Sequence, residues 1–182
     1  MPVQKYFIAI VVPEPFQTQL MVFKNVVKDK FNSKGALRSP AHITLHMPFE
    51  WKEEKEDALI NTLQQFTFSE GFIIDLQNFS CFEPRVLFVD VLKNELLEKL
   101  QRELIVYTQK NLRLLNQVND MRGFHPHVTI AFRDLKKEKF YQALNYFKTE
   151  TYTASFHAKS FCLLKHTGKE WLVNKEFFFT NT

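Results

Sequence analysis

The sequence is poor in glycine and cysteine, and it has neither a long apolar run nor a strong net charge. Only 4 of its 182 residues are glycine, and no stretch rich in Gly, Ser or Pro divides the chain, so we expect one domain over residues 1–182. The two cysteines, Cys81 and Cys162, lack the spacing of metal ligands and are expected to be reduced thiols of a cytoplasmic protein. The net charge of +4 is compatible with a phosphate-bearing ligand but does not require one.

Segments that would insert into a membrane are also lacking. The apolar run at 6–12 is too short to span a bilayer, and it ends at Pro13 rather than at a small-residue cleavage site. There is no glycine-rich phosphate loop of the G-x-x-x-x-G-K type. We therefore expect no membrane association, no P-loop chemistry and no bound cofactor.

Apolar residues make up 45% of the chain, and 20 of them are phenylalanine, which is enough for a well-filled core. Their spacing predicts one order of elements, strand, helix, strand, helix and strand, that occurs twice. The first copy is expected at 6–12, 16–31, 40–48, 53–66 and 72–79. The second is expected at 86–91, 94–107, 125–132, 134–147 and 152–164, followed by a last strand at 171–179.

The third element of each copy contains the same short motif, a histidine and a threonine two residues apart. The motifs are His42-Ile43-Thr44-Leu45 and His127-Val128-Thr129-Ile130. Residues i and i+2 of a strand point to one face, so each motif places an imidazole beside a hydroxyl. The equal rank indicates an internal duplication, with lobes at roughly 1–83 and 84–182 related by a pseudo-two-fold axis. The simpler alternative is two core histidines that bond to backbone carbonyls.

Two such pairs facing one another suit the cleavage of a cyclic phosphodiester. One histidine takes a proton from the nucleophile and the other gives a proton to the leaving oxygen, because imidazole titrates near neutral pH. Threonine hydroxyls donate to the non-bridging phosphate oxygens. We therefore predict His42, Thr44, His127 and Thr129 as catalytic residues that need no metal.

The two motifs resemble the paired motifs of the 2H phosphoesterase superfamily, which includes 2'-5' RNA ligase-like proteins and cyclic phosphodiesterases. The stretch 42–50 is especially similar to the YjcG-type branch. The resemblance implies an α+β fold of two mainly antiparallel sheets around a central cleft, with helices outside. It also implies a hydrolase that cleaves, or reversibly forms, 2',3'-cyclic phosphate or 2'-5' phosphodiester bonds in RNA or nucleotides.

Strand alternation adds substrate-binding candidates. His46 lies two residues after Thr44, and His125 lies two residues before His127, so in regular strands both share the motif faces. Arg133 follows the second motif and is a candidate phosphate ligand. A proline near each extra histidine can distort the strand, so a rim position without a role remains open for both.

Two other functions are consistent with the same residues. A non-catalytic module could bind a nucleotide or RNA end with them. A metal-dependent hydrolase could use His42, His125 and His127, although His42 and His46, roughly 13 Å apart on a strand, cannot share one ion. The expected partner is an RNA end or nucleotide with a cyclic phosphate, bound by a monomer.

Overall fold

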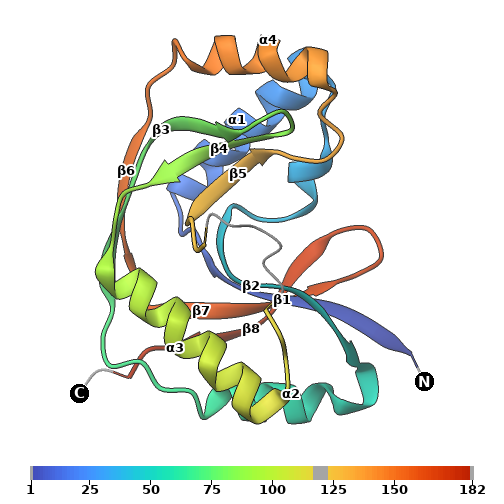
Figure 1. The fold of residues 1–182 in the computed structure, drawn as a ribbon, viewed down its shortest axis with the longest axis vertical. Coiled ribbons are helices and arrows are strands. Elements are labelled where there is room, and N and C mark those ends of the chain that lie inside the picture. The colour runs from blue at the N-terminus through green and yellow to red at the C-terminus, as the bar shows by residue number, and fades with distance from the viewer. Residues whose placement is uncertain (1, 117–122, 181–182) are drawn as a thin grey trace.

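A computed structural model describes residues 2–116 and 123–180, which form four α-helices and an eight-stranded antiparallel sheet (Figure 1). The α+β class is therefore confirmed. The strands are β1 (Val3–Val11), β2 (His42–Lys52), β3 (Phe72–Phe82), β4 (Val86–Val91), β5 (His127–Ala131), β6 (Thr153–Ala158), β7 (Ser160–His166) and β8 (Trp171–Phe178). The helices are α1 (Phe16–Phe31), α2 (Glu56–Gln64), α3 (Glu95–Leu112) and α4 (Lys137–Phe147), with short 3-10 turns η1 (Gly35–Arg38) and η2 (Glu53–Lys55).

The sheet has the order β6-β3-β4-β5-β2-β1-β7-β8. We call β3 to β6 the central lobe, because they are contiguous at 72–158, and β1, β2, β7 and β8 the terminal lobe, because they come from both ends of the chain. In the described chain, β2 and β5 pair at one position, Ile43 with Val128. That pair joins the two expected sheets into one curled sheet (Figure 1).

The sheet does not divide at the predicted boundary between residues 83 and 84. That boundary groups β3 with β1 and β2, whereas β3 pairs with β4 and β6. The physical reason is the tight turn at 83–85, which makes β3 and β4 an antiparallel hairpin. The chain therefore enters the central lobe after α2 and returns to the terminal lobe after β6.

The helices are exchanged between the lobes. Helix α1 connects two strands of the terminal lobe but contacts β5 and α4 of the central lobe. Helix α3 connects two strands of the central lobe but contacts β2 and α2. Figure 1 shows α1 and α4 beside the central lobe, and α2 and α3 beside the terminal lobe.

The main core lies between these helices and one face of the sheet. Ile10, Ile43 and Val128 are at most 2% exposed there, and the apolar stripe of α3 is buried against them. Helix α3 begins where its sequence predicts, because the Asn94 side chain accepts a hydrogen bond from the amide of Leu97 at 3.0 Å. Among the described residues, no helix combines the length and apolar character needed to cross a bilayer.

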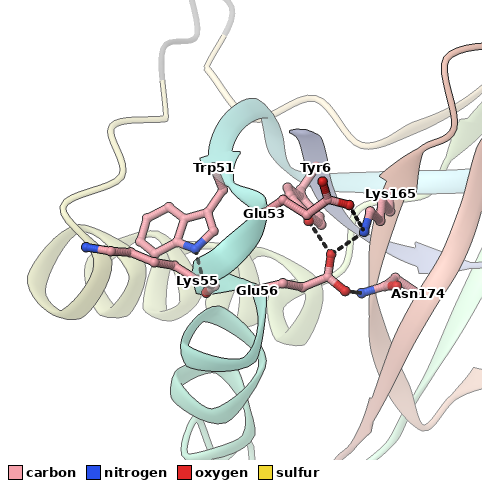
Figure 2. A network of polar contacts seen from close by, with 7 residues as sticks. All are labelled: Tyr6, Trp51, Glu53, Lys55, Glu56, Lys165 and Asn174. Atoms are coloured by element: carbon pink, nitrogen blue, oxygen red, sulfur yellow. Dashed lines mark hydrogen bonds and ion pairs between the residues drawn. The ribbon is translucent and has the colours of Figure 1, made fainter. Parts of the chain in front are cut away.

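Hydrogen bonds and ion pairs connect the start of α2 to the terminal lobe. Figure 2 shows the carboxylate of Glu56 held by three side chains. The hydroxyl of Tyr6 and the Nζ of Lys165, the latter at 2.5 Å, both donate to Oε2, and Nδ2 of Asn174 donates to Oε1 at 3.4 Å. Lys165 also lies 3.6 Å from Glu53. One carboxylate thus connects α2 with β1, β7 and β8.

Replacement of Glu56 by glutamine is expected to lower the free energy of unfolding by about 1–3 kcal/mol, because Lys165 then loses the nearer of its two ionised partners and keeps only Glu53. Burial alone would raise the pKa of Glu56, but hydrogen bonds from Lys165 and Tyr6 outweigh it, so the pKa is lowered. The stabilisation is therefore present above the carboxyl's usual pKa of 4.5 and is lost as the pH falls below it. Urea unfolding at pH 7 measures the effect. The matched control is Glu54→Gln, since Glu54 is exposed; equal losses in both variants would contradict the assignment.

Candidate active site

The two histidine-threonine motifs lie side by side at the junction of the lobes. Ile43 of β2 pairs with Val128 of β5 in antiparallel register. When this antiparallel register is extended by one residue on each side of the pair, His42 lies opposite Thr129 and Thr44 lies opposite His127. Ile43 and Val128 point into the core, so the four polar side chains share the opposite face, where each is partly buried. We call His42, Thr44, His127 and Thr129 the His-Thr site.

The two imidazoles are oriented by the same kind of hydrogen bond. Nδ1 of His42 lies 2.7 Å from the carbonyl oxygen of Pro40, and Nδ1 of His127 lies 2.7 Å from that of His125. A carbonyl accepts only, so Nδ1 carries a proton in each ring and Nε2 is the nitrogen that exchanges one. A bond from Nδ1 to a backbone carbonyl, the simpler alternative to catalysis, therefore does not itself occupy the Nε2 of either ring.

Aromatic rings support both imidazoles. The ring of Phe7 lies 4.8 Å from that of His42 at an angle of 46°. The ring of Phe88 lies 4.7 Å from that of His127 at 48°. The near-equal geometry extends the approximate two-fold symmetry of the site to its supporting side chains, and packing of this kind restricts ring rotation.

The threonine hydroxyls complete the site. The hydrogen bonds of the described residues include none from the hydroxyl of Thr44 or Thr129. Each hydroxyl has one proton to donate. Since Thr44 lies opposite His127 and Thr129 opposite His42, a group bound between the histidines would meet both donors.

The environment favours the neutral form of His42. Burial lowers its pKa to about 4, the bond to Pro40 opposes that shift, and the charges of Lys24 and His127 add to it. At pH 7 the Nε2 of His42 is therefore unprotonated. The influence of His127 also shows that the two rings are close enough to interact.

Helix α1 holds the segment that orients His42, through two residues that sequence reasoning missed. Gln17 accepts a hydrogen bond from the amide of Ala41 at 2.6 Å and donates to its carbonyl at 3.2 Å. Lys24, only 1% exposed, donates to the carbonyl of Ser39 at 2.9 Å. A signal was present: Lys24 follows Leu20 by four residues and precedes Val27 by three, which places a charge on the apolar face.

The structure does not place His46 with the His-Thr site, so the prediction that it shares that face is wrong. Between Ala9 and Ile8, β1 advances one residue while β2 advances two, from Thr44 to His46. This bulge reverses the alternation and turns His46 toward the core, where it is 1% exposed. Its Nδ1 lies 2.8 Å from the carbonyl of Met47.

His125 and Arg133, the other two binding candidates, have different positions. The ring of His125 lies 6.3 Å from that of His127, and its Nε2 is 3.4 Å from Oδ1 of Asp90. It therefore borders the His-Thr site. Arg133 lies beyond the end of β5, where its exposed guanidinium stacks 4.7 Å from the ring of Phe132.

No set of three or more His, Cys, Asp or Glu side chains with metal-binding geometry occurs in the described parts of the chain. Cys81 and Cys162 are free thiols.

Several solved structures share this fold. LigT of E. coli, solved in complex with 3'-AMP, has a TM-score of 0.71 at 20% identity, over 99% of this chain and 100% of that one. TT0787 of Thermus thermophilus has a TM-score of 0.65 at 18% identity, over 97% and 98% of the chains. Usb1 of Kluyveromyces marxianus has a TM-score of 0.51 at 13% identity, with the same coverage. No curated protein sequence matches the chain.

The family model of the 2'-5' RNA ligase superfamily matches residues 12–170. That range contains both motifs and most of the sheet. The resemblance to 2H phosphoesterases is thereby confirmed, and the chain belongs to the 2'-5' RNA ligase superfamily.

Proposed function

We propose that the protein is a metal-independent phosphoesterase that hydrolyses, or reversibly forms, 2',3'-cyclic phosphate or 2'-5' phosphodiester bonds in RNA or nucleotides. The observation that carries the proposal is the symmetric pairing of two Nδ1-anchored imidazoles with two hydroxyls on one face of the sheet. Nucleotide complexes of a relative support it, since LigT of E. coli has been solved with 3'-AMP, with ATP and with NADP+.

In hydrolysis of a 2',3'-cyclic phosphate, His42 acts as the base and His127 as the acid. Nε2 of His42 takes a proton from water as the water oxygen bonds to phosphorus. The bond from phosphorus to one ribose oxygen breaks, and Nε2–H of His127 gives that oxygen its proton. Because the environment disfavours a proton on His42, the one proton that the pair needs resides on His127.

The threonines stabilise the charge that develops in this step. The hydroxyls of Thr44 and Thr129 donate to the two non-bridging oxygens of the phosphorane-like transition state. We expect His125, which borders the site, to contact the same phosphate group. The products are a ribose hydroxyl and a phosphate monoester.

A compound screen read by phosphorus NMR tests the proposal. The compounds are 2',3'-cyclic nucleotides, oligoribonucleotides with a 2',3'-cyclic end and 2'-5'-linked oligonucleotides, each incubated with the protein in EDTA. We expect a cyclic-phosphate signal to be replaced by that of a monoester. Binding in calorimetry without product from any compound would instead indicate a non-catalytic module.

The pH dependence of kcat/KM is expected to have its acid limb near pH 4, because that limb reports protonation of His42 in the free enzyme. Lys24→Met removes a positive charge that lowers this pKa, so the limb should shift to higher pH. A limb near 6.5 in the parent protein, or an unchanged limb in the variant, would contradict the assignment of His42 as the base.

The same titration affects stability. The unfolded chain protonates His42 near pH 6.5, whereas the folded chain does so only near pH 4. As the pH falls from 6.5 to 4, the free energy of unfolding should therefore decrease, by up to roughly 3 kcal/mol from this group. Urea unfolding of the parent and of His42→Gln over this range isolates the contribution.

A further inference from the structure

A pocket of about 350 Å³ lies where the β3–β4 turn meets the segment between β5 and α4. Four of the residues that line it carry a positive charge, Arg85, Arg133, Lys136 and Lys137. They come from two segments 48 residues apart that the fold brings together. The His-Thr site does not include any of them.

Positive charges outnumber negative ones in the lining of this pocket by four to one. None of the four cations forms an ion pair with a residue that the structure describes. The one carboxylate in the lining, that of Asp134, is already engaged: it accepts hydrogen bonds from the hydroxyl of Ser33 at 2.6 Å and from the amides of Lys34 and Gly35 at 2.7 and 3.0 Å. The pocket is thus a concave surface with a net positive charge, which suits a polyanion.

An aromatic platform adjoins the pocket. Phe132 immediately precedes Arg133 and is 39% exposed; only Phe178 is also exposed among the phenylalanines that the structure describes. The Arg133 guanidinium lies 4.7 Å from the centre of the ring. An exposed aromatic ring next to clustered cations is the combination that single-stranded nucleic acid uses, with bases stacked on the ring and phosphates on the charges.

Strand β5 leads from the His-Thr site to this pocket. Thr129 lies two residues before the end of β5, and Arg133 lies two residues after it, on the order of 10 Å further along. The pairing of Leu87 with Ala131 brings Arg85 to the same end. We therefore expect the cations to meet neighbouring nucleotides of an oligonucleotide rather than the phosphate held between the two histidines.

We propose that this pocket, with Phe132, binds the single-stranded RNA that adjoins the reactive phosphate, so that the protein prefers RNA ends to mononucleotides. Phosphates of the strand lie against Arg85, Lys136 and Lys137, and one base stacks on Phe132. The statement about reactivity rests on the proposed function, but binding by the pocket can be measured without turnover.

The test compares two ligands and two triple variants. The ligands are a labelled single-stranded oligoribonucleotide that ends in a 3'-phosphate, followed by fluorescence anisotropy, and a nucleoside 3'-monophosphate as competitor. The pocket variant is Arg85→Ala with Lys136→Ala and Lys137→Ala. The matched control, Lys52→Ala with Lys93→Ala and Lys159→Ala, removes the same charge from exposed positions elsewhere.

We expect the pocket variant to bind the oligonucleotide at least about tenfold more weakly than the control at moderate salt. Its slope of log K against log salt should be smaller by about 2, since each lost phosphate contact on a single strand contributes roughly 0.7. Competition by the 3'-monophosphate should be unchanged. Equal losses in pocket and control variants would overturn the proposal, and so would an equal loss of affinity for heparin, which would indicate a general polyanion surface.

A second variant tests the stacking role. Phe132→Ala changes an exposed side chain, so it should fold, and it should weaken oligonucleotide binding at least about fivefold without altering the salt slope. An unchanged affinity for the oligonucleotide would mean that Phe132 takes no part in RNA binding. If no cyclic phosphate is cleaved but pocket-dependent RNA binding is observed, the catalytic proposal fails and this one stands; turnover with no pocket dependence gives the reverse result.

Discussion

Alanine at His42 or at His127 is expected to lower kcat on a 2',3'-cyclic substrate by at least about a hundredfold. Each variant removes one of the two proton-transfer groups, and a positioned acid or base contributes on the order of 10²- to 10⁴-fold. Loss of both histidines should cost little more than loss of one, because the two act as a unit in one displacement.

The pH profiles separate a chemical role from a structural one. His42→Ala should lose the acid limb of the kcat/KM profile and His127→Ala the basic limb, because each variant keeps only one of the two proposed proton-transfer groups. The matched control is His157→Ala on β6, since His157 is exposed and lies outside the His-Thr site. Thermal unfolding of all three variants checks that each is folded. Near-normal turnover of either site variant would refute two-histidine catalysis.

Valine at Thr44 or at Thr129 is expected to lower kcat by about a hundredfold with little change in KM. Valine has the shape of threonine but no hydroxyl, so each variant loses one donor to a non-bridging oxygen. Removal of one preorganised donor of this kind costs on the order of 10²- to 10³-fold in kcat. Serine at either position keeps the hydroxyl and should restore most of the rate.

The matched control is Thr153→Val, because Thr153 is exposed on β6 and valine suits a strand. A loss that appears mainly in KM would mean that the hydroxyls bind ground state and transition state equally, and an effect as large in the control would point to the strands rather than to the hydroxyls. The approximate symmetry of the site also predicts the relative size of the two effects. Thr44 and Thr129 should have comparable effects, since each lies opposite one histidine.

The shared face of His42 and Thr44 was predictable because alternation along a strand is a local property. His42 and Thr44 are two residues apart, and no irregularity intervenes, so the motif alone places them on one face. His46 is only two residues further, but the extra residue in β2 depends on pairing with β1, which the motif does not contain. One bulge was enough to move a predicted ligand into the core.

Most elements of the fold were predictable, but their grouping was not. The single strand expected at 152–164 is wrong: the structure has two strands there, β6 and β7, which pair with β3 and β1 in different lobes. Periodicity indicates a strand from its own residues, whereas the partner of β3 depends on comparing two connections. The turn from β3 to β4 is tight, whereas the connection from β2 to β3 runs through α2, so β3 pairs with β4. The repeated order of elements does not contain this information, and it therefore does not assign β3 to the central lobe. Lys24 is an intermediate case: its place on an apolar helix face was readable, but its partner, the carbonyl of Ser39, was not.

The exchange of α1 and α3 between the lobes has a consequence for how the protein unfolds. Each lobe is covered by a helix whose two ends are attached to strands of the other lobe. Unfolding of either lobe therefore removes the helix, α1 or α3, that packs on the other lobe, and exposes the apolar face of that lobe to water. We therefore expect the two lobes to unfold in one cooperative transition, and the His-Thr site, which takes one strand from each lobe, to form only in the fully folded chain.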